Sequence, residues 1–106
     1  MRPRYRLEYL REAEHELFDI QVLIRDYAGD AVARRKLAEI ETVTYNLCDY
    51  PKIGTVHDEL MPGMRAIPAG EKAVVCFTVD DESMTVLIVC ISYAGSDWQA
   101  RVKNRI

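Results

Sequence analysis

The spacing of hydrophobic and polar residues changes along the chain and divides it into predicted strands and helices. Residues 5–9 alternate apolar with charged side chains, which predicts a short strand. From residue 10 the apolar residues recur every three or four positions, which predicts a helix with one apolar stripe. That stripe consists of Leu10, Ala13, Leu17, Ile20, Ile24 and Tyr27. Gly29 is expected to end this helix and Asp30 to cap the next one.

A second helix is expected from about Ala31 to Cys48, because a residue before proline is disfavoured in a helix and Tyr50 precedes Pro51. Its buried side is predicted to consist of Ala33, Leu37, Ile40, Thr44 and Leu47. A polar connection over residues 52–63 follows. Strands are then expected at residues 64–68, 72–79 and 84–93, joined by links short enough to force antiparallel hairpins. The last strand is nearly all apolar, which places it in the interior of the sheet.

The element order is therefore β-α-α-β-β-β. It predicts an α+β fold, in which an N-terminal strand and a helical hairpin pack on an antiparallel sheet. The chain has 106 residues and no internal repeat, so residues 1–106 are expected to form a single domain.

Composition narrows the possible functions. The net charge is −3, so the chain lacks the basic surface of proteins that grip phosphates, and direct binding to nucleic acid is not expected. No apolar run is long enough to span a bilayer or to act as a signal peptide, which favours a cytoplasmic protein. The odd cysteine count, without a C-x-x-C spacing, favours neither a disulfide framework nor a zinc site. Cys76 and Cys90 are read as small core residues, and no metal or cofactor is expected.

Five local patterns follow one another along nearly the whole chain. They are Ala13-Glu14-His15-Glu16-Leu17, Leu47-x-x-Tyr50-Pro51-x-x-Gly54, Pro62-Gly63-x-Arg65, a strand at residues 74–79, and a closing strand at residues 86–93 with a polar tail. No single pattern is specific, but in this order they resemble the RelE/ParE superfamily of bacterial toxins. The resemblance implies the toxin of a type II toxin-antitoxin system, neutralised by a cognate antitoxin protein.

The superfamily contains two activities. RelE-like toxins cut messenger RNA at the ribosome without a metal, using a cluster of basic residues and a C-terminal tyrosine or histidine. ParE-like toxins act on DNA gyrase. A RelE-like reading would make Arg65 and Tyr93 the catalytic candidates. Such a reaction needs cations to stabilise the phosphorane, yet Lys72 is the one basic residue of the strand at 72–79, and three acidic residues follow that strand.

We therefore expect a ParE-like toxin that inhibits DNA gyrase and has no catalytic residue of its own. Two alternatives remain open at this point: a RelE-like, ribosome-dependent messenger-RNA endonuclease, and a decayed member that binds an antitoxin without being toxic. The neighbouring reading frame and the phenotype that follows induction would distinguish these three possibilities.

The candidate partner-binding residues lie in the second half of the chain. They are Met64, Arg65, Ile67, Tyr93, Trp98 and Arg101. The antitoxin is expected to dock as an amphipathic segment across the helical hairpin and the sheet, beside an open edge at residues 64–68. Trp98 either covers the sheet or anchors a partner. The polar, basic segment from Tyr93 to Ile106 is expected to matter more for toxicity than for folding.

Overall fold

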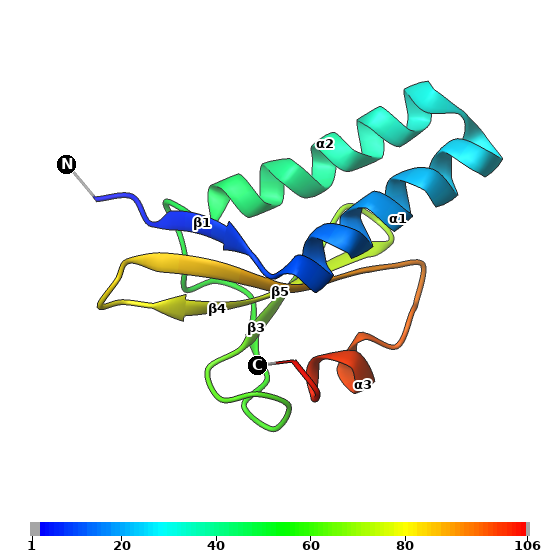
Figure 1. Cartoon of the computed structure of the whole chain (residues 1–106). Helices are drawn as coiled ribbons and strands as arrows, with labels where there is room; N and C mark the ends of the chain where they lie inside the picture. The colour runs from blue at the N-terminus through cyan, green and yellow to red at the C-terminus, as the bar shows by residue number, and fades with distance from the viewer. Residues whose placement is uncertain (1–2, 106) are drawn as a thin grey trace.

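The computed structural model describes residues 3–105, so the expectations for residues 1, 2 and 106 lie outside it. Two long helices form a hairpin above a twisted sheet, and a short helix near the C-terminus lies below it (Figure 1). The elements in chain order are β1 (Arg6–Tyr9), α1 (Arg11–Ala28), α2 (Asp30–Asn46), β2 (Thr55–Val56), β3 (Arg65–Ala69), β4 (Ala73–Asp80), β5 (Thr85–Tyr93) and α3 (Trp98–Val102).

The sheet has five strands in the order β1-β5-β4-β3-β2. The predicted α+β architecture, with a helical hairpin on a sheet and the last strand inside it, is confirmed. Two details were wrong. β1 pairs parallel to β5, so the sheet is mixed rather than antiparallel. The predicted open edge at residues 64–68 is partly covered, because β2 pairs Thr55 with Ala66 and Val56 with Arg65.

The sheet has a hydrophobic cluster on each face. The α1–α2 hairpin covers one face, where Ile20, Ile24 and Ile40 pack with Phe77 and Ile88. On the other face, α3 brings a smaller set of side chains together. These are Met64, Ala66, Cys76, Val89, Cys90 and Val102, all buried. The core is therefore divided by the sheet, and the segment after β5 closes its second half.

A β-bulge in β5 decides which side chains reach which face. Phe77 of β4 lies opposite Ile88, but its neighbour Cys76 lies opposite Cys90, so Val89 is the extra residue. Val89 and Cys90 consequently both belong to the cluster under α3, whereas Ile88 belongs to the cluster under the hairpin. Strict alternation in the sequence would not have placed two neighbours on one face.

The turn between α1 and α2 is tight because the backbone of Gly29 adopts φ +93°, a conformation that residues other than glycine rarely take. The prediction that Asp30 caps α2 was wrong: Gly29 holds the cap position, Asp30 is the first helical residue, and no side chain caps this end. Tyr27 was predicted in the apolar stripe of the first helix but is mostly exposed, because it lies in the last turn, beyond most of the sheet.

Candidate functional site: a groove on the helical hairpin

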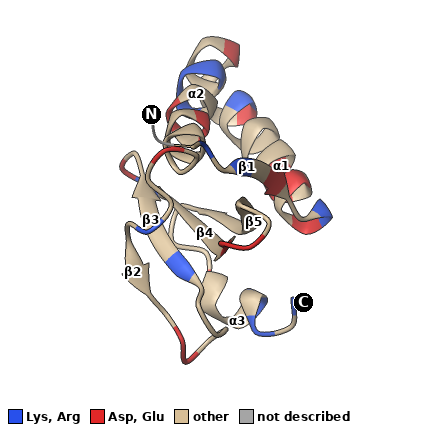
Figure 2. Ribbon diagram, turned by 90° about the vertical axis from the view of Figure 1, so that its left-hand side faces the viewer, with Lys and Arg blue, Asp and Glu red and all other residues tan. Residues whose placement is uncertain are grey.

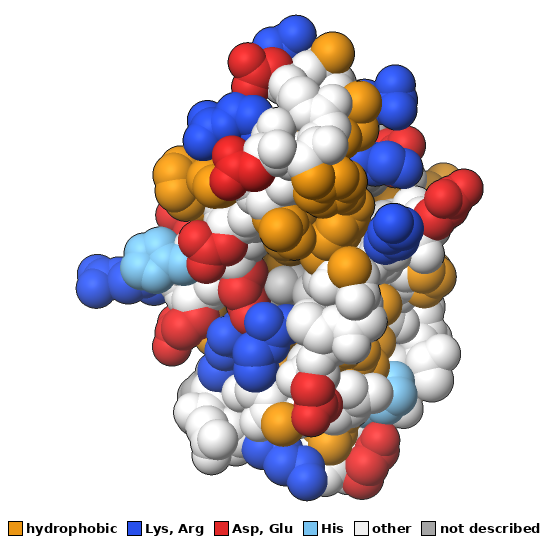
Figure 3. Space-filling view, turned by 90° about the vertical axis from the view of Figure 1, so that its right-hand side faces the viewer, with side chains coloured by type: hydrophobic (Ala, Val, Ile, Leu, Met, Phe, Trp, Pro, Cys, Tyr) orange, Lys and Arg blue, Asp and Glu red, His pale blue; other side chains and the backbone are white. Residues whose placement is uncertain are grey.

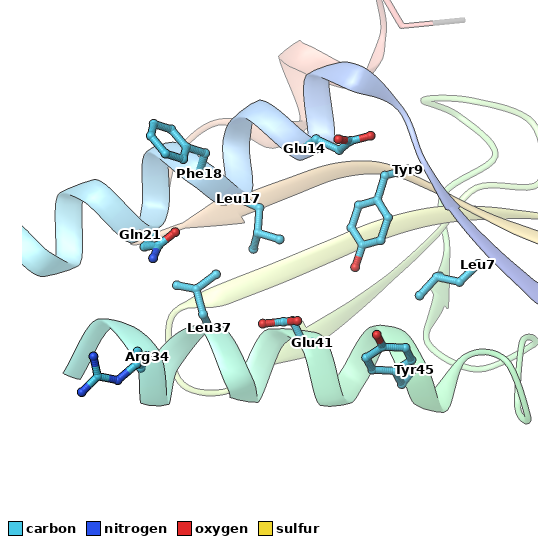
Figure 4. Close-up of a pocket in the computed structure, with 10 residues that line it drawn as sticks. All are labelled: Leu7, Tyr9, Glu14, Leu17, Phe18, Gln21, Arg34, Leu37, Glu41 and Tyr45. Carbon is cyan, nitrogen blue, oxygen red and sulfur yellow. The ribbon is translucent and has the colours of Figure 1, made fainter. Parts of the chain in front are cut away.

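A groove of about 550 Å³ runs between α1 and α2 and ends at β1. Its floor is apolar: Leu17 of α1 and Leu37 of α2 point toward each other across it, and Leu7 of β1 lies at one end (Figure 4). The complete lining is Leu7, Tyr9, Glu14, Leu17, Phe18, Gln21, Arg34, Leu37, Glu41 and Tyr45. An apolar floor between two helices is the kind of surface that an amphipathic segment covers.

Aromatic side chains stand on both rims of the groove. Phe18 of α1 is 62% exposed and Tyr45 of α2 is 59% exposed. Leu23 and Tyr27 are also exposed, but on the other side of α1: Leu23 lines a hollow beside Ile91 of β5, and the Tyr27 hydroxyl lies 2.9 Å from that of Tyr93. Figure 3, which faces the right-hand side of Figure 1, shows apolar side chains gathered over the upper half of the molecule with charged groups around them. An apolar floor with exposed aromatic side chains at its rims is typical of a protein-binding site.

The polar groups of the groove differ from one end to the other. Glu14 of α1 and Glu41 of α2 lie toward the strand end, and Arg34 lies nearer the hairpin tip (Figure 4). Within residues 3–105, none of these three charged side chains has a hydrogen bond or ion pair. They are therefore available to a partner without breaking an internal contact.

Tyr9, at the strand end of the groove, already has a hydrogen-bond partner within the fold. Its hydroxyl donates to Thr44 Oγ1 at 3.0 Å. Burial raises the pKa of this phenol above its ordinary value, so it stays neutral at physiological pH. Tyr9 thus contributes shape to the groove rather than charge.

The opposite side of α1, which faces β5 and the C-terminal segment, shows a closed arrangement around Glu16. This carboxylate is only 11% exposed and forms a bidentate pair with Arg105, with both N–O distances 2.8 Å. It also pairs with Arg101 Nη1 at 3.1 Å and accepts the backbone N–H of Ile91 at 3.0 Å. Arg105 in turn donates to the carbonyl of Val89 at 2.8 Å. Two arginines from the C-terminal segment are thereby fixed to α1 and β5.

Glu16 lies outside the apolar stripe predicted for the first helix, and nothing in that pattern indicates that it is enclosed. Helical periodicity shows which residues share a face, but it does not show that another segment covers that face. The ion pairs with Arg101 and Arg105 join positions more than 80 residues apart, which no local pattern indicates. The available signal was the pair of arginines in a short tail of an otherwise acidic chain.

Arg65 and Tyr93, the alternative catalytic pair, do not come together. Arg65 on β3 lies opposite Phe77 and Tyr93 on β5 lies opposite Ala73, so β4 separates them. Four residues of extended strand add about 13 Å to that separation. The Tyr93 hydroxyl instead lies 2.9 Å from the hydroxyl of Tyr27. This hydrogen bond, together with burial, raises the pKa of Tyr93 to about 12.

The other predicted partner-binding residues are mostly used inside the molecule. Met64 is fully buried and offers no surface to a partner, which corrects its place among the contact candidates. Ile67 packs against the cluster under the hairpin. Trp98 packs against the cluster under α3 and meets His57 edge-on at 5.2 Å between ring centroids, so it covers the sheet. Arg101 is held by Glu16.

The C-terminal segment is correspondingly part of the fold. Val102 is fully buried and Arg105 is 12% exposed at its side chain. Arg101 and Arg105 of this segment pair with one buried carboxylate instead of facing solvent, so the segment contributes to the fold. That it matters more for toxicity than for folding stays a prediction.

Several other features bear on chemistry. Cys76 and Cys90 are fully buried, as expected of core residues. His57 pairs with Glu59 at 3.0 Å in the connection before β3. Among residues 3–105, no group of three His, Cys, Asp or Glu side chains is placed to bind a metal ion. In the same range, no helix combines the length and apolar character needed to cross a membrane.

Comparisons with known proteins agree with this architecture. The chain is similar to the chromosomal ParDE toxin-antitoxin system of P. aeruginosa, with 19% identity and a TM-score of 0.72 over 85% of this chain and 96% of that one. A mutant of the E. coli RelE toxin in the free state matches with 14% identity and a TM-score of 0.65 over 94% of both chains. The RelBE2 complex of Mycobacterium tuberculosis matches with 17% identity and a TM-score of 0.61, over 85% of this chain and 98% of that one.

At these identities the solved structures establish the fold alone. Among curated proteins, none matches the chain by sequence. The model of one family, described as the ParE toxin of the type II toxin-antitoxin system parDE, matches residues 7–98. That range runs from β1 to the start of α3 and includes the whole hairpin groove. The chain therefore belongs to the ParE toxin family of type II toxin-antitoxin systems.

Proposed function

We propose that this chain is a toxin directed at DNA gyrase, and that a cognate antitoxin neutralises it by occupying the hairpin groove. The observation that carries the antitoxin site is the groove itself: an apolar floor, exposed aromatic rims and charged side chains that no internal partner uses. Solved complexes of similar fold from P. aeruginosa and M. tuberculosis are described as toxin-antitoxin assemblies, which supports a protein partner of this kind.

The choice of gyrase over messenger RNA rests on the placement of the cations. RNA cleavage requires positive charge convergent on one phosphate, together with a base and an acid. Arg65 and Tyr93 lie on opposite sides of β4, and Arg101 and Arg105 are paired with Glu16. Figure 2 shows Lys and Arg scattered over helices, loops and the tail, with the strands mostly uncharged. Such a distribution favours a binding protein over a nuclease.

The test is induction of the chain alone in a bacterial host, with DNA supercoiling and protein synthesis followed in the same culture. We expect relaxed or damaged DNA and filamentation before protein synthesis falls. A supercoiling assay with purified gyrase and purified toxin should show inhibition. Immediate translation arrest with cleaved messenger RNA that disappears in Arg65→Ala would establish the RelE-like alternative. Normal growth with intact antitoxin binding would identify a decayed member.

The antitoxin half of the proposal is tested separately by co-expression with the product of the neighbouring reading frame. We expect growth to be restored and the two proteins to purify together. Replacing Leu17 and Leu37 together by Ser should abolish co-purification because it makes the floor of the groove polar. Unchanged co-purification by a folded Leu17→Ser/Leu37→Ser variant would place the antitoxin elsewhere.

A further inference from the structure

The hairpin groove has opposite charge at its two ends, and this polarity points to a specific kind of partner segment. Resting on the proposed role of the groove in antitoxin binding, we propose that Glu14, Glu41 and Arg34 select one helical segment that is basic at one end and acidic at the other. The apolar floor then supplies general affinity, and the order of charges decides which partner is accepted.

The α2 side of the groove sets the spacing of these charges. Arg34 and Glu41 are seven residues apart, which is two helical turns, so both side chains lie on the same stripe. Leu37 lies between them, and Tyr45 continues the stripe one turn beyond Glu41. The rise of an α-helix puts about 10 Å between the levels of Arg34 and Glu41.

The α1 side reinforces the same order. Because α1 and α2 are antiparallel, the start of α1 lies beside the end of α2, and Glu14 therefore faces the end marked by Tyr45 (Figure 4). Gln21, two turns further along α1, faces the Arg34 end. One end of the groove thus carries two carboxylates and the other a guanidinium, each exposed and unpaired within residues 3–105.

The occupant that matches this surface is an amphipathic helix of about three turns, since Arg34 to Tyr45 spans about 16 Å of helix. Its apolar stripe would contact Leu17 and Leu37 between the aromatic rims. A lysine or arginine near one end would meet Glu14 and Glu41, and an aspartate or glutamate about seven residues away would meet Arg34. A uniformly acidic helix would instead place like charges against the two glutamates, which lowers affinity and excludes wrong partners.

Two synthetic, side-chain-stapled helical peptides test the proposal directly. Both have 16 residues and identical apolar positions; the first has lysines at one end and glutamates at the other, and the second has glutamates at both ends. With the full-length toxin, fluorescence anisotropy should show the bipolar peptide binding at least tenfold more tightly, with a difference that shrinks as salt rises. Equal affinities, or no binding of either peptide, would overturn the proposal.

A charge-reversed groove gives the second arm. In Glu14→Lys/Glu41→Lys all three groove charges are positive, so the preference should invert in favour of the uniformly acidic peptide. The matched control is Glu12→Lys/Asp26→Lys, which makes the same change of net charge at exposed positions of α1 outside the groove lining and should keep the native preference.

An unchanged preference in Glu14→Lys/Glu41→Lys contradicts the inference even if the antitoxin still restores growth. Failure of the antitoxin to restore growth would instead contradict the proposed function, so the two failures are distinguishable. Circular dichroism spectra that match the native protein are the check that each variant is folded.

Discussion

Two glutamates that are two residues apart on α1, Glu14 and Glu16, have opposite surroundings. Glu14 faces the hairpin groove, is exposed, and has no ion pair within residues 3–105. Glu16 is 11% exposed and binds Arg101, Arg105 and the backbone of Ile91. The two residues have the same chemistry and the same helix. The difference shows that one side of α1 is covered by the chain's own C-terminal segment, whereas the groove side is exposed and is the side for which we propose a partner.

The physical reason lies in the edge of β5. β1 pairs with β5 only as far as Ile88, because the chain then turns into α1. Beyond that point the backbone groups of β5 on this side have lost their strand neighbour, and buried backbone groups need a hydrogen-bond partner. Glu16 accepts from the N–H of Ile91, and Arg105 donates to the carbonyl of Val89. A side-chain ion pair thus continues the sheet edge where the strand has ended.

The largest effect is expected from removing the C-terminal segment after Asp97. The truncation exposes the cluster around Met64, Val89 and Cys90, and it leaves the buried carboxylate of Glu16 without cations. Loss of Val102 alone should cost about 1.5–3 kcal/mol, and breaking the buried pair about 3–5 kcal/mol. Because a domain of this kind is stabilised by only about 5–15 kcal/mol, the truncated chain should not fold cooperatively in a thermal melt.

The control for this truncation is Lys103→Ala, which changes an exposed residue of the same segment. It should alter the free energy of unfolding by less than about 0.5 kcal/mol. A truncated protein that melts like the full-length chain would show that the clasp made by Arg101 and Arg105 is dispensable for the fold.

The next largest effect is expected from Glu16→Ala compared with Glu14→Ala. The first leaves Arg105 and the Ile91 N–H unpaired, and should lower the free energy of unfolding by about 3–5 kcal/mol. The second removes an exposed side chain and should cost at most about 0.5 kcal/mol. Urea denaturation of the two variants measures the contrast, and Arg105→Ala combined with Glu16→Ala should cost far less than the sum of the single changes. Equal losses of stability in Glu16→Ala and Glu14→Ala would refute the distinction between the two sides of α1.

A smaller effect concerns Tyr93 and its pH dependence. Its folded-state pKa of about 12 lies above the ordinary value of 10.0. The folded chain therefore keeps the Tyr93 proton where the unfolded chain loses it, so this contribution to stability is complete below pH 10 and is lost as the pH rises through about 12. In Tyr27→Phe the hydrogen bond is absent, and ultraviolet titration should show Tyr93 ionising at lower pH. An unchanged titration curve would mean that Tyr27 does not hold this proton.

The smallest effect on stability is expected from Glu41→Lys in the groove. Its side chain is exposed and has no internal ion pair among the described residues, so unfolding should change by less than about 0.5 kcal/mol. Binding of the bipolar peptide should nevertheless weaken about tenfold, the size expected when one close charge contact becomes repulsive. A large loss of stability with unchanged peptide binding would show that Glu41 stabilises the fold and takes no part in binding.

The α+β class, the helical hairpin and the interior position of β5 could all be predicted from the sequence. These follow from local signals: the three-and-four spacing that gives α1 its buried Ala13, Ile20 and Ile24, the glycine at position 29, and the nearly continuous apolar run of the last strand. The buried side of α2 was predicted residue by residue for the same reason. Periodicity reports which residues share a face, and the hairpin on its sheet is built from such faces.

Which faces are covered, and by which segments, depends on tertiary contacts. The short strand β2, the parallel pairing of β1, the bulge at Val89 and the clasp of Glu16 by Arg105 depend on contacts between segments distant in sequence. A glutamate facing water and a glutamate facing two arginines have the same local pattern, so no spacing separates Glu14 from Glu16. The lining of the groove likewise could not be predicted from the sequence, because its charges and its floor come from β1, α1 and α2, which are brought together by packing.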